Sequence, residues 1–203
     1  GFAGDILQMR CAVQAARQAM LDAGREVPIQ VQVTIESTGT MLVGTDDAAA
    51  LVALEALPID VVGMNCATGP DLMDSHIRYF CQNSTRWVSC LPNAGLPRNE
   101  GGREVYDLSP AELVRWQQKF VRDYGLNVVG GCCGTGPEHI RALAGAVSAL
   151  APAKSQPRSF PASVASLYQS VALRQDTGIL IVGERTNATG SKKFRELLFS
   201  QDF

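Results

Sequence analysis

The sequence predicts an α/β fold: the second half of a (β/α)8 TIM barrel, followed by the start of another domain. Segments typical of a strand and of a helix alternate four times, at a spacing of roughly 30 residues, which indicates βα units around a parallel sheet. A helical segment precedes the first strand, so an earlier strand is expected to be missing. Polar residues alternate along the first strand, at Gln30, Gln32 and Thr34. A polar face suits a strand near a barrel mouth better than the doubly covered centre of a flavodoxin-like open sheet, which is the alternative.

Five elements are predicted in the first half of the chain. They are a helix over residues 5–23, a strand over 29–36, a helix over 46–57, a strand over 59–64 and a helix that opens at Pro70. Gly24 ends the first helix, because glycine readily adopts the left-handed conformation of a C-cap. Strict alternation predicts the first strand, and Thr45 is the expected N-cap of the second helix.

The second half repeats the pattern. Its elements are a strand over 87–91, a helix from Pro110, a strand over 126–130 and a helix over 137–150. Ser109 and Glu112 have the spacing of a capping box, with proline at the first helical position. These residues therefore predict two further βα units.

Beyond residue 150 the composition shifts. Pro, Ala, Ser and Lys dominate the next stretch, so residues 151–177 are predicted to be a linker. Residues 179–183 are typical of the first strand of a new domain, and Thr189–Ser191 of the start of its first helix. The predicted domains are 1–150 and 178–203.

Composition limits the classes of partner. The 203 residues carry a net charge of -2, with 46% hydrophobic and 19% charged residues, as in an ordinary globular protein. No cluster of lysine and arginine favours nucleic acid or an anionic membrane, and no apolar run approaches the ~20 residues of a spanning helix. The six cysteines indicate free or metal-bound thiols in a reducing compartment, here the cytoplasm, and not a disulfide framework. Three of them, Cys11, Cys81 and Cys90, are predicted to be small buried apolar residues.

The other three cysteines each follow a predicted strand. Cys66 ends one strand, and Cys132 and Cys133 end another that lies two βα units later, so all three are expected at one barrel mouth. Neighbouring side chains of a strand point to opposite faces, but the glycines around the pair permit a turn that brings both sulfurs to one side. Three thiolates suit a zinc ion with an open fourth position, where a thiol substrate would be held deprotonated. Inert or structural cysteines, and redox thiols, are the alternatives.

Two groups of motifs resemble known methyltransferases. Gly63–Cys66, Leu91–Pro97 and Gly130–Thr135 together resemble the barrel of the zinc-dependent homocysteine methyltransferases. Val182–Ser191 resembles the opening of the pterin-binding domain in the cobalamin-dependent branch of that family. The resemblance covers essentially the whole chain. It implies the C-terminal half of a homocysteine-binding domain, a linker, and the truncated first βα unit of a second TIM-like barrel.

The resemblance also implies the site residues. Those that match zinc ligands are Cys66, Cys132 and Cys133. Asn93 matches a residue beside the metal that is a possible fourth ligand or substrate contact. Those that match the start of the pterin site are Glu184, Thr186 and Asn187. No catalytic residue is predicted beyond the metal site.

The implied activity is methyl transfer to the sulfur of homocysteine, giving methionine. Methylcobalamin is the implied donor, bound by another module of the same polypeptide and regenerated from 5-methyltetrahydrofolate. Without that module the chain is expected to be inactive. The alternatives are a betaine or sulfonium donor, or a non-catalytic structural zinc module.

Overall fold

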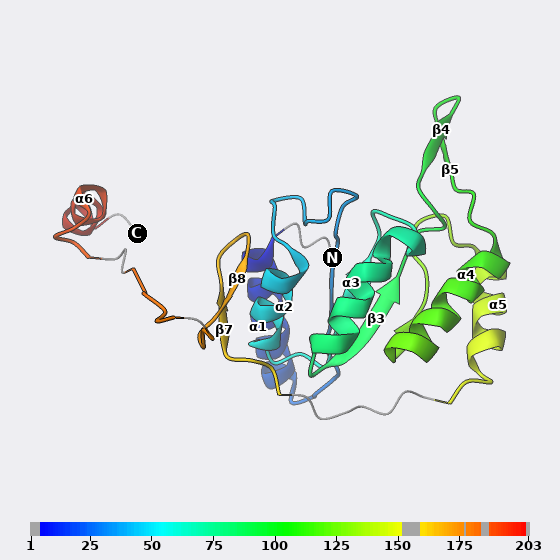
Figure 1. The fold of residues 1–203 in the computed structure, drawn as a ribbon, viewed down its shortest axis with the longest axis horizontal. Coiled ribbons are helices and arrows are strands. Elements are labelled where there is room, and N and C mark those ends of the chain that lie inside the picture. The colour runs from blue at the N-terminus through cyan, green and yellow to red at the C-terminus, as the bar shows by residue number, and fades with distance from the viewer. Residues whose placement is uncertain (1–4, 152–158, 177, 184–186, 202–203) are drawn as a thin grey trace. The chain divides into compact units, whose positions relative to one another are not determined.

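The computed structural model describes residues 5–151, 159–176, 178–183 and 187–201. The chain divides into two compact units, Gly1–Ala172 and Leu173–Phe203, which are drawn in Figure 1.

A parallel four-stranded sheet forms the centre of the first unit. Its strands, in spatial order, are β1 (Gln30–Val33), β2 (Val61–Asn65), β3 (Trp87–Leu91) and β6 (Val128–Val129). Parallel strands that follow one another in sequence are thus also neighbours in space. This order agrees with a partial barrel, whereas a flavodoxin-like sheet would place its second strand on the other side of the first.

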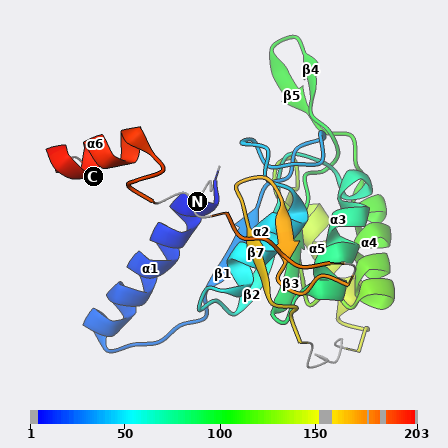
Figure 2. The same cartoon turned by 60° about the vertical axis from the view of Figure 1, so that its left-hand side comes forward.

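Helices cover one face of this sheet. They are α1 (Ile6–Ala23), α2 (Asp47–Glu55), α3 (Pro70–Asn83), α4 (Pro110–Lys119) and α5 (Pro137–Val147). Right-handed crossovers that all advance in one direction place α2, α3 and α4 on the same side, as Figures 1 and 2 show. A π-helical turn, Phe120–Tyr124, follows α4. The apolar core lies between sheet and helices, and its largest strand and α3 side chains include Met64, Met73, Ile77 and Phe80.

The opposite face of the sheet carries polar side chains from β1, β2 and β3, among them the alternating residues predicted for the first strand. Gln32, Gly63 and Ser89 stand in register across β1, β2 and β3. Because Gly63 has no side chain, Gln32 Nε2 reaches across it and donates a hydrogen bond of 3.1 Å to Ser89 Oγ. One step nearer the carboxyl ends, Thr34 Oγ1 donates to Asn65 Oδ1 at 3.4 Å.

Side-chain hydrogen bonds cap the first turns of α2 and α4. Asp46, not the predicted Thr45, caps α2, and its carboxylate accepts from the Ala49 amide at 2.7 Å. Asp46 is half-buried, whereas Thr45 is fully buried. The predicted capping box at α4 is confirmed, with both reciprocal bonds between Ser109 and Glu112 present.

Ser109→Ala is therefore expected to loosen the first turn of α4 by about 1 kcal/mol. Amide exchange of residues 111–113 in the full-length protein should accelerate roughly fivefold, since the orphan amides lose their acceptor. The matched control is Ser148→Ala, because the Ser148 hydroxyl bonds only the Gly145 carbonyl at the end of α5. Equal exchange of the α4 amides in wild type and Ser109→Ala would contradict this prediction.

Two antiparallel hairpins were not expected from the sequence. One, formed by β4 (Arg98–Glu100) and β5 (Arg103–Val105), follows β3 and stands away from the sheet (Figure 1). The other, β7 (Ser163–Ala165) with β8 (Ser170–Ala172), lies within the predicted linker. The carbonyl of Tyr168, in the turn between β7 and β8, accepts from the Asp46 amide at 3.0 Å. This part of residues 151–177 therefore belongs to the first unit.

The second unit contains one described helix, α6 (Lys192–Ser200), which Ser191 caps by accepting from the Phe194 amide. The prediction of a strand over residues 179–183 is wrong for the described structure, where these residues belong to no strand. A strand needs a partner for its backbone groups, and the described residues of this unit provide none. Ile179 and Ile181 are accordingly 93% and 88% exposed.

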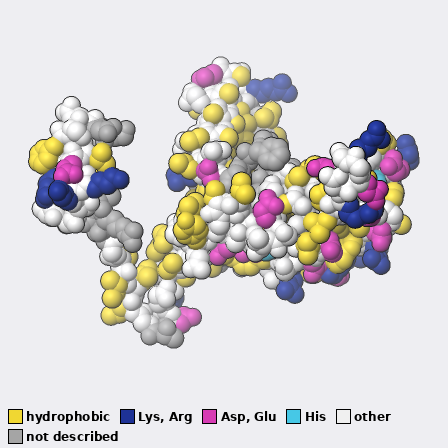
Figure 3. All heavy atoms as spheres, turned by 90° about the horizontal axis from the view of Figure 1, so that it is seen from above, with side chains coloured by type: hydrophobic (Ala, Val, Ile, Leu, Met, Phe, Trp, Pro, Cys, Tyr) yellow, Lys and Arg dark blue, Asp and Glu magenta, His cyan; other side chains and the backbone are white. Residues whose placement is uncertain are grey.

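The surface carries charges of both signs. On the face that Figure 3 shows, acidic and basic side chains of the described residues are interspersed, without an extended patch of one sign. In the described part of the chain, no helix is both long enough and apolar enough to cross a membrane.

Candidate metal centre

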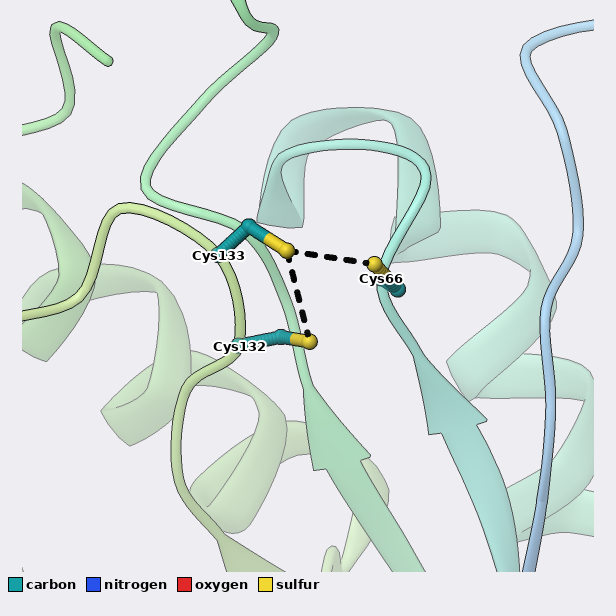
Figure 4. Close-up of side chains that lie close together, drawn as sticks. All are labelled: Cys66, Cys132 and Cys133. Atoms are coloured by element: carbon teal, nitrogen blue, oxygen red, sulfur yellow. Dashed lines mark hydrogen bonds between the residues drawn. The ribbon is translucent and has the colours of Figure 1, made fainter. Parts of the chain in front are cut away.

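Three sulfur atoms meet at the carboxyl edge of the sheet. Cys66 follows β2 directly, and Cys132 and Cys133 lie in the loop after β6 (Figure 4). The Cys133 sulfur lies 3.5 Å from that of Cys66 and 3.9 Å from that of Cys132, and all three lie within 4.8 Å of one another. The convergence on which the zinc prediction depends is present in the structure.

Cys66 leaves its strand through an unusual backbone turn. Both Cys66 and Ala67 have left-handed backbones, with φ of 62° and 58°, a conformation that costs a residue with a side chain about 1 kcal/mol. Hydrogen bonds hold this turn: the Cys66 amide donates to the Leu91 carbonyl at 3.1 Å, and the Thr68 amide to the Cys66 carbonyl at 2.7 Å. The Asn93 amide donates in turn to the Thr68 carbonyl at 3.0 Å. This strained turn points the Cys66 sulfur towards the loop that carries Cys132 and Cys133.

The segment that follows β3 also holds the second cysteine loop. The Cys132 amide donates to the Pro92 carbonyl at 2.7 Å, and the Ala94 amide donates to the Cys133 carbonyl at 2.9 Å. Asn93 is buried, and its Oδ1 accepts from the Cys133 amide at 3.1 Å. Residues 91–94 therefore lie between the two loops and fix each of them, which sets the separation of the sulfurs.

Glycines allow the loop after β6 to lie close to its neighbours. A Cβ on Gly130 would come within 2.1 Å of Leu91 Cδ2, and one on Gly131 within 2.5 Å of Thr135 Cγ2. Of the three glycines around the cysteine pair, Gly134 alone has a left-handed backbone, with φ of 77°. Gly130 and Gly131 are thus required for close approach, and Gly134 for the turn.

The sulfur geometry fits a tetrahedral metal. With Zn–S bonds of about 2.3 Å, tetrahedral angles place two sulfurs ~3.8 Å apart, close to the separations of 3.5 and 3.9 Å in the structure. Among the described residues, these three cysteines are the single group of His, Cys, Asp or Glu side chains close enough to share an ion. A fourth coordination position is therefore left for a ligand from outside the triad.

Crowding of the thiols affects their ionisation. The hydrogen bond with Cys66, partial burial and the neighbouring Cys132 raise the pKa of Cys133 to about 11. A cation is the natural partner of such a site, because metals bind the thiolate form.

Neither histidine belongs to the group of side chains that could share an ion. His139 Nδ1 accepts from the Gly136 amide at 3.1 Å, so its Nε2 carries the proton and donates to the Leu108 carbonyl at 2.9 Å. His76 pairs with Asp47 at 2.8 Å. His139 thus holds the start of α5 against the chain that precedes α4.

Comparison with known proteins agrees with this geometry. Residues 3–147 match the sequence profile of the family described as homocysteine S-methyltransferase. The chain belongs to the homocysteine S-methyltransferase family. It is also similar to two proteins named methionine synthase, with 46% identity to the one from Mycobacterium tuberculosis (strain ATCC 25618 / H37Rv) and 44% to the one from Mycobacterium leprae (strain TN). Each alignment covers 98% of this chain but 17% of the relative.

Within this member of the family, the remaining predicted residues have different outcomes. Cys81 and Cys90 are buried as predicted, and burial raises the pKa of the Cys90 thiol. Cys11 is exposed on α1, so its predicted burial is wrong. The predicted pterin residues Glu184 and Thr186 lie outside the described residues. Asn187 is described, and its Oδ1 accepts from the Thr189 amide at 2.8 Å.

Proposed function

We propose that Cys66, Cys132 and Cys133 hold a zinc ion that activates homocysteine for methylation. The meeting of three sulfurs at the sheet edge, with a coordination position left open, is the observation that carries this proposal. A closed structural site would instead take a fourth protein ligand. Bound there, zinc would act as a Lewis acid that keeps a substrate thiol deprotonated at neutral pH.

The chain's own residues position this site. Residues 91–94 lie between the two cysteine loops and are hydrogen-bonded to both. The three sulfurs, and with them the open coordination position, therefore have a fixed orientation relative to the sheet. Asn93 is buried within this segment, and we propose that it is the residue that contacts the substrate or occupies the fourth position. Because its Oδ1 accepts from the Cys133 amide, either role requires a rotation of the side chain or the use of its amide nitrogen for the substrate.

The methyl donor is proposed from the relatives. Two proteins named methionine synthase align with nearly the whole chain, and the sequence resembles the cobalamin-dependent branch of the family. We infer methylcobalamin as donor, carried by another module of the full-length protein and regenerated from 5-methyltetrahydrofolate. Methylcobalamin, when bound by its own module, would supply the methyl group, and the cysteine site of this chain would hold the homocysteine sulfur that receives it.

The start of the folate site is proposed to lie in the second unit. Glu184, Thr186 and Asn187 would contribute a carboxylate, a hydroxyl and an amide, groups suited to the donor and acceptor edge of a pterin ring. The full-length protein would therefore be a cobalamin-dependent methionine synthase.

Zinc coordination tests the proposal directly. In the zinc-loaded full-length protein, X-ray absorption should show three sulfur ligands, and added homocysteine should raise the number to four. Methylcobalamin should then yield methionine, whereas betaine or a sulfonium donor should yield none. A coordination sphere that homocysteine leaves unchanged would instead favour a structural zinc module, and turnover with betaine would favour the other branch of the family.

A further inference from the structure

His139 is buried in the first turn of α5 and uses both of its ring nitrogens. Its Nδ1 accepts from the Gly136 amide at 3.1 Å, and its Nε2 donates to the Leu108 carbonyl at 2.9 Å. The two partners lie in different segments, because Gly136 ends the cysteine loop whereas Leu108 directly precedes the N-cap of α4. One neutral imidazole, which carries a donor and an acceptor, therefore joins the cysteine loop to the chain before α4.

Leu108 extends this link to the cysteine pair. Its amide donates to the Ala94 carbonyl at 2.9 Å, and the Ala94 amide donates to the Cys133 carbonyl, also at 2.9 Å. From Cys133 the hydrogen bonds thus run through Ala94, Leu108 and His139 to Gly136, which lies in the same loop as Cys133. Residues 133–136 close the path, so these hydrogen bonds form a closed network around the second cysteine loop.

The two neighbouring cysteines differ in what holds their carbonyl groups. The Cys132 carbonyl accepts from the amide of Thr135 at 3.2 Å and from its hydroxyl at 2.6 Å, and both bonds stay within the loop. The Cys133 backbone instead bonds outside the loop, its amide to Asn93 Oδ1 and its carbonyl to the Ala94 amide. The position of Cys133 therefore depends on Ala94, and through it on the closed network.

We propose that His139 is a positioning residue of the metal centre: through Leu108 and Ala94 it fixes the backbone of Cys133, and with it the place of the sulfur. This proposal rests on the proposed zinc site. Metal sites bind tightly when their ligands are held in place by groups outside the coordination sphere, and such groups typically contribute 10–100-fold in affinity. A role confined to the first turn of α5 would involve the bond to Gly136 alone and would leave zinc binding unchanged.

Two substitutions separate the two ring nitrogens in the full-length protein. In His139→Asn, Oδ1 takes the place of Nδ1 as acceptor for the Gly136 amide, but the shorter side chain does not reach Leu108. Chelator competition should show zinc bound about 10-fold more weakly than in wild type. Hydrogen exchange of the Ala94 amide, measured without metal, should accelerate, whereas the Gly136 amide should keep its protection.

His139→Gln is the conservative variant that should restore the site. Its longer side chain carries a donor and an acceptor on one amide group, so it can serve both Gly136 and Leu108. Zinc affinity and exchange of the Ala94 amide should therefore stay close to the wild-type values.

Gln118→Ala is the matched control for a general loosening of the helices. Gln118 Nε2 donates to the Ala146 carbonyl at 3.2 Å and so links α4 to the end of α5 that lies away from the cysteine loop. Its loss should lower the thermal midpoint of unfolding, as His139→Asn does, but should leave zinc affinity unchanged.

Three results would overturn the proposal. They are wild-type zinc affinity in His139→Asn, and a loss in either His139→Gln or Gln118→Ala as large as that in His139→Asn. A wild-type protein that binds no zinc would overturn the proposed function itself, and this proposal with it.

Discussion

Replacing Cys66 with alanine is expected to abolish stoichiometric zinc binding in the full-length protein and to lower methyl transfer to homocysteine more than ~100-fold. Loss of a hydrogen-bond partner of a metal ligand typically costs 10–100-fold in affinity, and loss of the ligand itself removes a metal–sulfur bond. Cys66 also comes from a different strand than the other two cysteines. Its removal leaves two adjacent thiols on one loop, which cannot enclose an ion from both sides.

Zinc content after exhaustive dialysis and methionine formation are the two measurements. The matched control is Cys11→Ala, which removes an exposed thiol of α1 outside the triad and should leave both values unchanged. Retention of one zinc per chain by Cys66→Ala would show that the metal lies elsewhere. Cys90→Ala is a poorer control, because that thiol is fully buried and its loss would leave a cavity.

Periodicity and strand order were sufficient to predict the sheet and the edge at which the cysteines meet. Cys66 and the Cys132–Cys133 pair each follow an apolar run, and parallel strands place their carboxyl ends at one edge. The capping box at Ser109 was also predictable, because it depends on residues close in sequence.

The detailed shape of the site was not predictable, because it depends on contacts between distant segments. No local signal marks Cys66 and Ala67 as left-handed. That conformation is held by distant residues: the Leu91 carbonyl accepts from the Cys66 amide, and the Asn93 amide donates to the Thr68 carbonyl. The same holds for Gly130, whose lack of a side chain is explained by Leu91 and not by its own backbone. The β4–β5 hairpin escaped prediction since its strands have three residues each and are rich in charge.

The sequence also mispredicted which side chains are exposed to solvent. Cys11 lies in the first helix, where two side chains, Met9 and Val13, are buried. Composition alone suggested that a cysteine there would be buried as well, but the helix presents it to solvent. Residues 179–183 have the apolar character of a strand, yet a strand forms only where a neighbour accepts its hydrogen bonds.

Gly63→Ala is expected to destabilise the first unit by at least about 3 kcal/mol, beyond the usual cost of an added methyl group in a packed site. A Cβ at this position would lie 2.1 Å from both the carbonyl oxygen and the hydroxyl oxygen of Ser89. The carbonyl belongs to the backbone of β3, so no side-chain rotation relieves the clash. The strands β2 and β3 would have to separate, which also breaks the bond from Gln32 across Gly63.

This change would reach the metal centre as well. Cys66 lies three residues beyond Gly63, and its amide donates to the Leu91 carbonyl at the end of β3. Separating the two strands moves the Cys66 sulfur away from the other two, so zinc affinity should fall together with the thermal midpoint of unfolding. Gly145→Ala is the matched control: this glycine lies inside α5 with nothing within 4 Å of the place that a methyl group would take, and alanine there should stabilise the helix by up to about 1 kcal/mol. Calorimetry and zinc competition with a chelator give the two measurements, and a Gly63→Ala protein as stable as Gly145→Ala would show that β2 and β3 are not packed as the structure has them.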